Sequence, residues 1–244
     1  MRVAVYNQMF GLDGRSFWGN LLGHWAVHYQ KNPLKIWKRA NLSETFKVVK
    51  KIDADVQGVI EVLEGQEKEI IRGLKKLGYR YFYFGKGHKT KYSHLHVMGL
   101  VASKIRGVEK RYKEWPLEDE LGGGGGMIVV NFPKLKLNLV NIHLATPEKN
   151  LFFEQIKHTQ KVLRKLTGKV VLMGDFNESF KNVEEHFSDL DLVSGRTKTC
   201  SFTPIMKRFC YKDMDHILVR GLKKKDLGFV KGRSDHLAVW ADLE

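Results

Sequence analysis

Short apolar runs alternate along the chain with segments in which apolar residues recur at helical spacing. The short runs predict strands at residues 3–6, 56–62, 79–84, 95–103, 127–132, 135–144 and 169–173, and near 198–203, 209–219 and 236–243. Helical spacing predicts helices over 42–52 and 66–77, the second ending at Gly78, and a third from Thr146 to Gly168. Such a mixture of strands and covering helices predicts a layered sandwich.

The 244 residues are enough for one large domain, which would bury about three quarters of its unfolded surface. We expect a single domain over 1–244 with a basic and aromatic insertion at about 12–40, since no Pro/Ser-rich linker divides the chain. Glycines at 122–126 predict a surface loop, because glycine leaves the backbone unrestricted. A phosphate-binding loop is the alternative, disfavoured because no Lys-Ser/Thr follows the glycines.

A formal net charge of +15 favours a polyanionic partner, nucleic acid first and an anionic membrane second. Residues 14–43 contain no acid, and their cations alternate with aromatic residues. Cations there would neutralise phosphates and tryptophans would stack on bases, unless each tryptophan simply buries one side of an amphipathic segment. Candidate substrate contacts in this insertion are Arg15, Trp18, Lys35, Trp37, Lys38 and Arg39.

The sequence carries none of the usual signs of export or of a membrane anchor. No apolar run approaches the ~20 residues of a membrane span, and residues 3–6 begin a strand where a secretory leader would lie. We therefore expect a cytoplasmic protein. Cys200 and Cys210 flank a turn, and a cross-strand disulfide between them competes with the reduced state that is usual inside cells.

Polar residues follow or end several of the predicted strands, and these residues suit a hard divalent cation and a phosphate ester. They are Asn7, Glu61, His143, Asp175, Asn177, Asp215, Asp235 and His236. Glu61 is the best metal-ligand candidate, because Mg²⁺ prefers a few carboxylates and keeps several waters, although Glu64 competes for this role. Asn7 and Asp235 would complete or flank the ion.

Residues 171–177 and 233–236, with 214–219 between them, resemble the endonuclease/exonuclease/phosphatase superfamily, which includes deoxyribonucleases, abasic-site endonucleases, sphingomyelinases and inositol 5-phosphatases. The resemblance implies an α/β (α+β) four-layer sandwich of the deoxyribonuclease-I-like type, with two packed mixed β-sheets flanked by helices and the site at one edge. It also implies a Mg²⁺ cofactor, for which Mn²⁺ can substitute, with Glu61 as the primary ligand. No signature of a particular subfamily is present.

His236 is the candidate catalytic imidazole, able to take a proton from the attacking water while Asp215 holds its other nitrogen. Alternatively, Asp175 activates the water and protonated His236 stabilises the transition state. Asp175 and Asn177 would point to the same side of an extended segment and reach one phosphate or water. For His143 the resemblance implies contact with the scissile phosphate or protonation of the leaving group. Phosphate binding is favoured, because residues 90–102 offer no carboxylate partner.

His94, His96 and Arg233 are further candidate substrate contacts, although surface imidazoles and a zinc site are alternatives for the two histidines. Together these features predict a Mg²⁺-dependent phosphodiester hydrolase, most simply a DNA endonuclease. The alternatives are a phosphatase or phosphodiesterase for a lipid or small phosphoester, and a nucleic-acid-binding module without catalysis.

Overall fold

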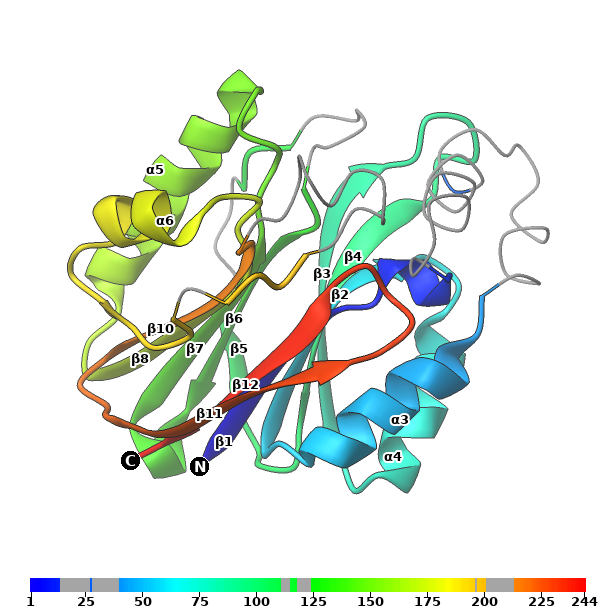
Figure 1. The fold of residues 1–244 in the computed structure, drawn as a ribbon, viewed down its shortest axis with the longest axis horizontal. Coiled ribbons are helices and arrows are strands. Elements are labelled where there is room, and N and C mark those ends of the chain that lie inside the picture. The colour runs from blue at the N-terminus through cyan, green and yellow to red at the C-terminus, as the bar shows by residue number, and fades with distance from the viewer. Residues whose placement is uncertain (14–26, 28–39, 111–114, 118–123, 196, 201–212) are drawn as a thin grey trace.

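Two six-stranded β-sheets pack face to face, and helices cover both outer surfaces (Figure 1). The computed structural model describes residues 1–13, 27, 40–110, 115–117, 124–195, 197–200 and 213–244. Among the described helices, none combines the length and the apolar composition that crossing a membrane requires. The predicted four-layer sandwich is confirmed.

The first sheet joins both ends of the described chain. In spatial order its strands are β11 (Lys224–Lys231), β12 (Leu237–Leu243), β1 (Arg2–Asn7), β2 (Val56–Leu63), β4 (His96–Ser103) and β3 (Tyr81–Lys89). The second sheet follows the order β5 (Val108–Lys110), β6 (Gly126–Phe132), β7 (Leu137–His143), β8 (Lys169–Asp175), β10 (Asp215–Arg220) and β9 (Asp191–Leu192).

Each sheet is sandwiched between a shared core and its own helices. Val5, Ile60, Leu139 and Ile217 belong to the buried cluster between the sheets. On the outer face of the first sheet lie α3 (Leu42–Ile52) and α4 (Glu67–Lys76), and on that of the second lie α5 (Asn150–Lys165) and α6 (Phe180–His186) (Figure 1). Two short 3₁₀ helices, η1 (Met9–Gly11) and η2 (Pro133–Leu135), complete the described elements.

Two parallel strand pairs determine where the polar strand ends meet. β1 runs parallel to β2, and β7 runs parallel to β8, so the carboxyl ends of each pair lie at one edge of their sheet. Strands β10 and β12 run antiparallel to β8 and β1, and therefore begin at that same edge. The topology thus gathers the functional candidates from both sheets at one edge of the sandwich.

The boundaries of several elements differ from the prediction. Helix α5 begins at Asn150 and not at Thr146, because residues 146–149 form a turn closed by a bond from Lys149 N to Thr146 O. Of the strand predicted near 198–203, the described part forms only an isolated bridge between Cys200 and His236. Strands β5, β9 and β11 and helix α6 were not predicted.

The glycine tract was expected to be a surface loop, and this is wrong for Gly124–Gly126, which are buried. A Cβ atom on Gly125 would come within 2.5 Å of His143 Nδ1, and one on Gly87 would come within 2.5 Å of Gly125. Gly126 begins β6 with a φ of 92°. Because these glycines have no side chain, the backbone can pack closely against His143 and Gly87 at the edge of the sandwich. Residues 122 and 123 lie outside the described part.

A bidentate ion pair between Arg2 and Asp242 links β1 to β12 in the first sheet. Arg2 donates from Nε and Nη2 to the two carboxylate oxygens of Asp242, at 2.9 and 2.8 Å. These hydrogen bonds hold the pKa of the Asp242 carboxyl below its usual value. The unfolded chain therefore binds more protons in acid than the folded chain does. The contribution of the ion pair to the free energy of unfolding is fully present above the pKa of Asp242 in the unfolded chain, about 3.9. It is lost as the pH falls through the lower pKa of Asp242 in the folded chain.

We expect Asp242→Asn to lower the free energy of unfolding at pH 7 by about 0.5–1 kcal/mol, as for other partly exposed ion pairs. The variant should also lose less stability than the wild type between about pH 5 and pH 2. Urea unfolding across this pH range measures both effects. Asp191→Asn, which removes an exposed carboxylate of β9, is the control. If the Asp242 variant and the wild type lose equal stability in acid, the pKa of Asp242 is not lowered in the folded chain.

Candidate active site

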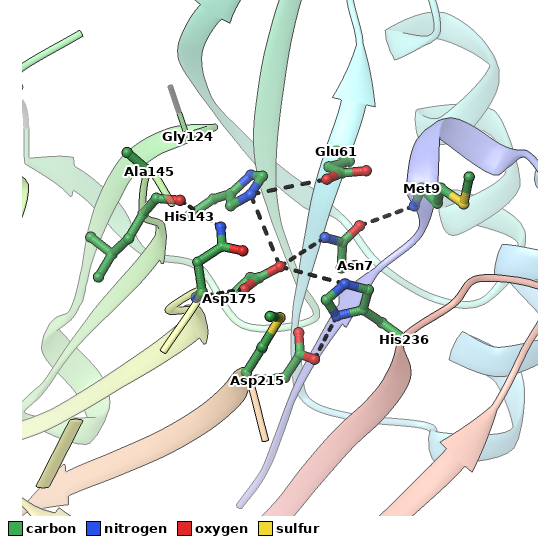
Figure 2. Close-up of polar contacts among 12 residues, drawn as sticks. Asn7, Met9, Glu61, Gly124, His143, Ala145, Asp175, Asp215 and His236 are labelled. Atoms are coloured by element: carbon green, nitrogen blue, oxygen red, sulfur yellow. Dashed lines mark hydrogen bonds and ion pairs between the residues drawn. The ribbon is translucent and has the colours of Figure 1, made fainter. Parts of the chain in front are cut away.

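The predicted polar groups converge where the strands of the two sheets end (Figure 2). Asn7 ends β1, Glu61 lies in β2, His143 ends β7 and Asp175 ends β8. Asp215 begins β10, directly opposite Asp175 in the register, and His236 immediately precedes β12. Polar side chains from the two sheets therefore lie next to one another at this edge.

The carboxylate of Asp175 lies at the centre of this group and is buried. Its Oδ2 accepts a hydrogen bond from Asn7 Nδ2 at 2.9 Å, and its Oδ1 accepts one from the main-chain N–H of Asn177 at 2.9 Å. The same Oδ2 lies 3.8 Å from His236 Nε2 and 4.0 Å from His143 Nε2 (Figure 2). Both carboxylate oxygens are therefore anchored, with two imidazoles just beyond hydrogen-bond distance.

His236 and Asp215 form the predicted pair. His236 Nδ1 lies 2.7 Å from Asp215 Oδ2, and both side chains are buried. Burial acts to lower the pKa of His236, but the adjacent Asp215 carboxylate and further acidic side chains outweigh it and raise that pKa well above its usual value. Burial also raises the pKa of Asp215, so the two groups compete for protons. The 2.7 Å contact fits an Nδ1–H that donates to Asp215, and Nε2 then faces Asp175.

Thr199 supports this pair and was not predicted. Its Oγ1 accepts hydrogen bonds from the main-chain N–H groups of Met214 and Asp215, at 3.0 and 2.9 Å. Its main-chain carbonyl accepts a bond from Leu237 N at 2.7 Å. Thr199 thus links the strand that carries Asp215 to the strand that follows His236. A single threonine far from both in sequence offers no motif by which it could have been found.

Glu61 occupies an irregular position in β2. The pairing of β2 with β4 shifts register between Val59 and Val62, and Glu61 has a φ of 57°. Burial raises the pKa of Glu61 to about 8, and the charge of Asp235 adds to the effect. A carboxylate so disfavoured in its charged form suits a divalent cation, which would offset both the burial and the repulsion. Glu61, with the neighbouring amide of Asn7, would hold that cation.

Glu64 is engaged elsewhere, and its Oε2 accepts a hydrogen bond from His96 N at 2.9 Å. Glu61 is therefore preferred over Glu64 as the ligand. Asp235 is buried and accepts a hydrogen bond from Ser234 Oγ at 3.1 Å. Its carboxylate lies within 4.8 Å of the ligand atoms of Cys200 and His236, so these three residues could together hold a metal ion. The role of Asp235 as a ligand of the cation held by Glu61 stays a prediction.

His143 is a neutral imidazole, and among the described residues no carboxylate bonds to its Nδ1 nitrogen. Its Nε2 lies 4.0 Å from Glu61 Oε1, while its Nδ1 is buried beside Gly125 and has no hydrogen-bond partner in the described part of the chain. Burial lowers the pKa of His143 to about 4. A neutral ring can donate one N–H to a phosphate oxygen. This arrangement favours phosphate binding by His143 over protonation of a leaving group.

Asn177 lies beside Asp175, but the expectation of an extended segment is wrong. Asn177 has a φ of 50°, so the chain turns after β8, and the main-chain N–H points back to Asp175. The Asn177 side chain donates from Nδ2 to Leu144 O at 2.8 Å. Asn177 therefore holds the loop after β7 in place, and its Oδ1 and second Nδ2 hydrogen remain for a phosphate or water. Phe176 is buried in the core, as expected.

Of the predicted substrate contacts, His94, His96 and Arg233 belong to the described residues. His94 is exposed with a φ of 52°, and His96 Nδ1 lies 3.0 Å from Gly87 O. Arg233 forms an ion pair with Asp13 at 2.7 Å. Cys200 is a buried free thiol, and its pairing with Cys210 stays a hypothesis because Cys210 lies outside the described residues. Also outside them are Arg15, Trp18, Lys35, Trp37, Lys38 and Arg39.

Comparison with known proteins agrees with the fold. A family model described as the Endonuclease/Exonuclease/phosphatase family matches residues 23–236. A family protein from Leptotrichia buccalis is similar in structure at 14% identity and a TM-score of 0.69, covering 100% of this chain and 99% of that one. No curated protein matches by sequence.

Two further solved structures are also similar over 100% of this chain and 99% of their own. One is an AP endonuclease from Archaeoglobus fulgidus, at 13% identity and a TM-score of 0.62. The other is a mannosyl-6-phosphatase from Bacteroides thetaiotaomicron, at 17% identity and a TM-score of 0.60. At these identities the likeness shows a shared fold. Family members hydrolyse phosphoester bonds and generally depend on a divalent metal ion. The chain belongs to the endonuclease/exonuclease/phosphatase family.

Proposed function

We propose that this protein is a Mg²⁺-dependent phosphodiesterase that cleaves nucleic acid, with DNA as the favoured substrate. The proposal depends above all on the buried His236–Asp215 pair, in which His236 Nε2 faces Asp175. The 3.8 Å between His236 Nε2 and Asp175 Oδ2 is too long for a hydrogen bond, which leaves an N–H at Nε2 for a phosphate oxygen.

The raised pKa of His236 favours one of the two roles left open for it. A protonated imidazole cannot accept a proton from water, but it stabilises negative charge that develops on the phosphate. Asp175, whose oxygens are anchored by Asn7 and Asn177, then accepts the proton of the attacking water. His143 donates a hydrogen bond to the phosphate. When bound at Glu61, the cation would neutralise charge on the phosphate oxygens.

Charge favours a polymeric substrate over a small phosphoester. The net charge is +15, and Glu109 is the only acid among residues 86–110. Residues 90–95 connect β3 to β4 at the edge where β2 delivers Glu61, and they expose Lys91 and Tyr92. A cation and an aromatic ring there suit a phosphate and a base. The similar AP endonuclease supports this choice, and the similar mannosyl-6-phosphatase supports a small phosphoester as the second candidate.

We expect the protein to cut end-labelled DNA in Mg²⁺ and to lose this activity in EDTA. Single-stranded, duplex and abasic-site substrates, resolved on gels, would give the specificity. Glu61→Gln should require at least about tenfold more Mg²⁺, because a carboxylate ligand is lost. Glu64→Gln is the matched control, since Glu64 bonds to His96 N. Hydrolysis of sugar phosphates without DNA cleavage would favour the second candidate.

Asp215→Asn should reduce kcat by about 10²–10⁴ while leaving KM nearly unchanged, because the charge that keeps His236 protonated is removed. Single-turnover kinetics on the preferred substrate measures this loss. The matched control is Asp213→Asn, because Asp213 accepts a hydrogen bond from Phe180 N. A loss below about tenfold would refute the assigned role of the pair.

Lys91→Glu should raise KM for DNA several-fold and leave the hydrolysis of a small aryl phosphodiester unchanged, since only a polymer reaches the loop at 90–95. Lys225→Glu, in β11, is the control with the same charge change: it lies near the end of β11 that pairs with Leu243, at the opposite edge of the sheet. If both variants weaken DNA cleavage equally, net charge and not this loop accounts for binding.

A further inference from the structure

Cys200 lies beside the active site, although no step of the proposed reaction uses it. Its backbone pairs with that of His236 in an isolated antiparallel bridge, and the thiol is buried. Burial raises the pKa of the Cys200 thiol to about 11, so this cysteine is a poor nucleophile and a poor redox sensor at neutral pH. Its position next to the catalytic imidazole calls for a different explanation.

Three different donor groups meet at this point. Cys200, Asp235 and His236 each offer a ligand atom, and these three atoms lie within 4.8 Å of one another. All three side chains are buried. A thiolate, an imidazole and a carboxylate form the ligand set that zinc and cadmium prefer, with a fourth position left for water. Magnesium, which takes oxygen ligands, has no such preference.

We propose that Cys200, Asp235 and His236 form an inhibitory site for a soft divalent metal ion of the Zn²⁺ or Cd²⁺ type. Coordination releases two protons to the buffer, one from the Cys200 thiol and one from the His236 nitrogen that binds the metal. Nδ1 is bonded to Asp215 and Nε2 faces Asp175, so either mode of coordination removes His236 from its place in the proposed reaction. The metal-binding part of this inference is independent of the proposed function, and only the inhibition depends on it.

Cadmium binding to the full chain, without Mg²⁺ or substrate, tests the site directly. The ultraviolet charge-transfer band between thiolate and cadmium should saturate at one equivalent in the wild type. The chain has two cysteines, so Cys210→Ser is a matched control that should keep the band, whereas Cys200→Ser should lose it. Cys200→Ala, with thermal unfolding of each variant, separates loss of the ligand from loss of the fold. Asp235→Asn should weaken binding about 10–100-fold.

No band in the wild type, or a band that persists in Cys200→Ser, would overturn the proposal. Loss of the band in both cysteine variants would also overturn it, because the site would then consist of the two thiols. In Mg²⁺-driven cleavage, Zn²⁺ should inhibit Cys200→Ser at least about tenfold more weakly than Cys210→Ser. Equal inhibition of the two variants would overturn the inhibitory role. If the protein cleaves no phosphoester at all, the cadmium band still tests the site.

Discussion

The buried carboxylate of Asp175 joins the two sheets at the edge where the polar strand ends meet. Its Oδ2 accepts from Asn7 of the first sheet, while its own strand belongs to the second. Burying an ionised group without hydrogen-bond partners costs several kcal/mol. A shift of one sheet against the other would break the bond from Asn7 and destabilise the fold by such an amount. The hydrogen bond from His236 to Asp215 crosses between the sheets in the same way. The relative placement of the sheets and the geometry of the site therefore depend on the same bonds.

Much of this arrangement could be predicted from the sequence, for a physical reason. Strands β1 and β8 are buried on both faces, so each appears as a run of four consecutive apolar residues. The polar residues that end these runs are conspicuous. Strand β11 was missed because its first residues are lysines exposed at the edge of the first sheet. Such an edge strand needs no apolar run, and its charges discourage pairing with another chain.

Predictability was lower where a residue acts through tertiary contact. Thr199 supports Asp215 from a distance of sixteen residues along the chain, and no local pattern distinguishes it from other threonines. The glycines near residue 125 suggested a flexible loop, because composition does not reveal that His143 packs against them. Asn177 was placed correctly beside Asp175, yet its side chain holds Leu144 O. Local spacing predicts which residues approach each other and leaves their hydrogen-bond partners undetermined.

The two sides of the site differ in chemistry, and Asp235 lies between them. Asn7 and Glu61 offer hard oxygen atoms from the first sheet, whereas Cys200 and His236 offer sulfur and nitrogen across the isolated bridge. The charge of Asp235 acts on Glu61, and its carboxylate also lies within 4.8 Å of the ligand atoms of Cys200 and His236. A carboxylate binds hard and soft cations alike, so in the two proposals the metal ion that is bound would decide which side Asp235 serves. The same acid would then couple the proposed phosphoester chemistry to its inhibition.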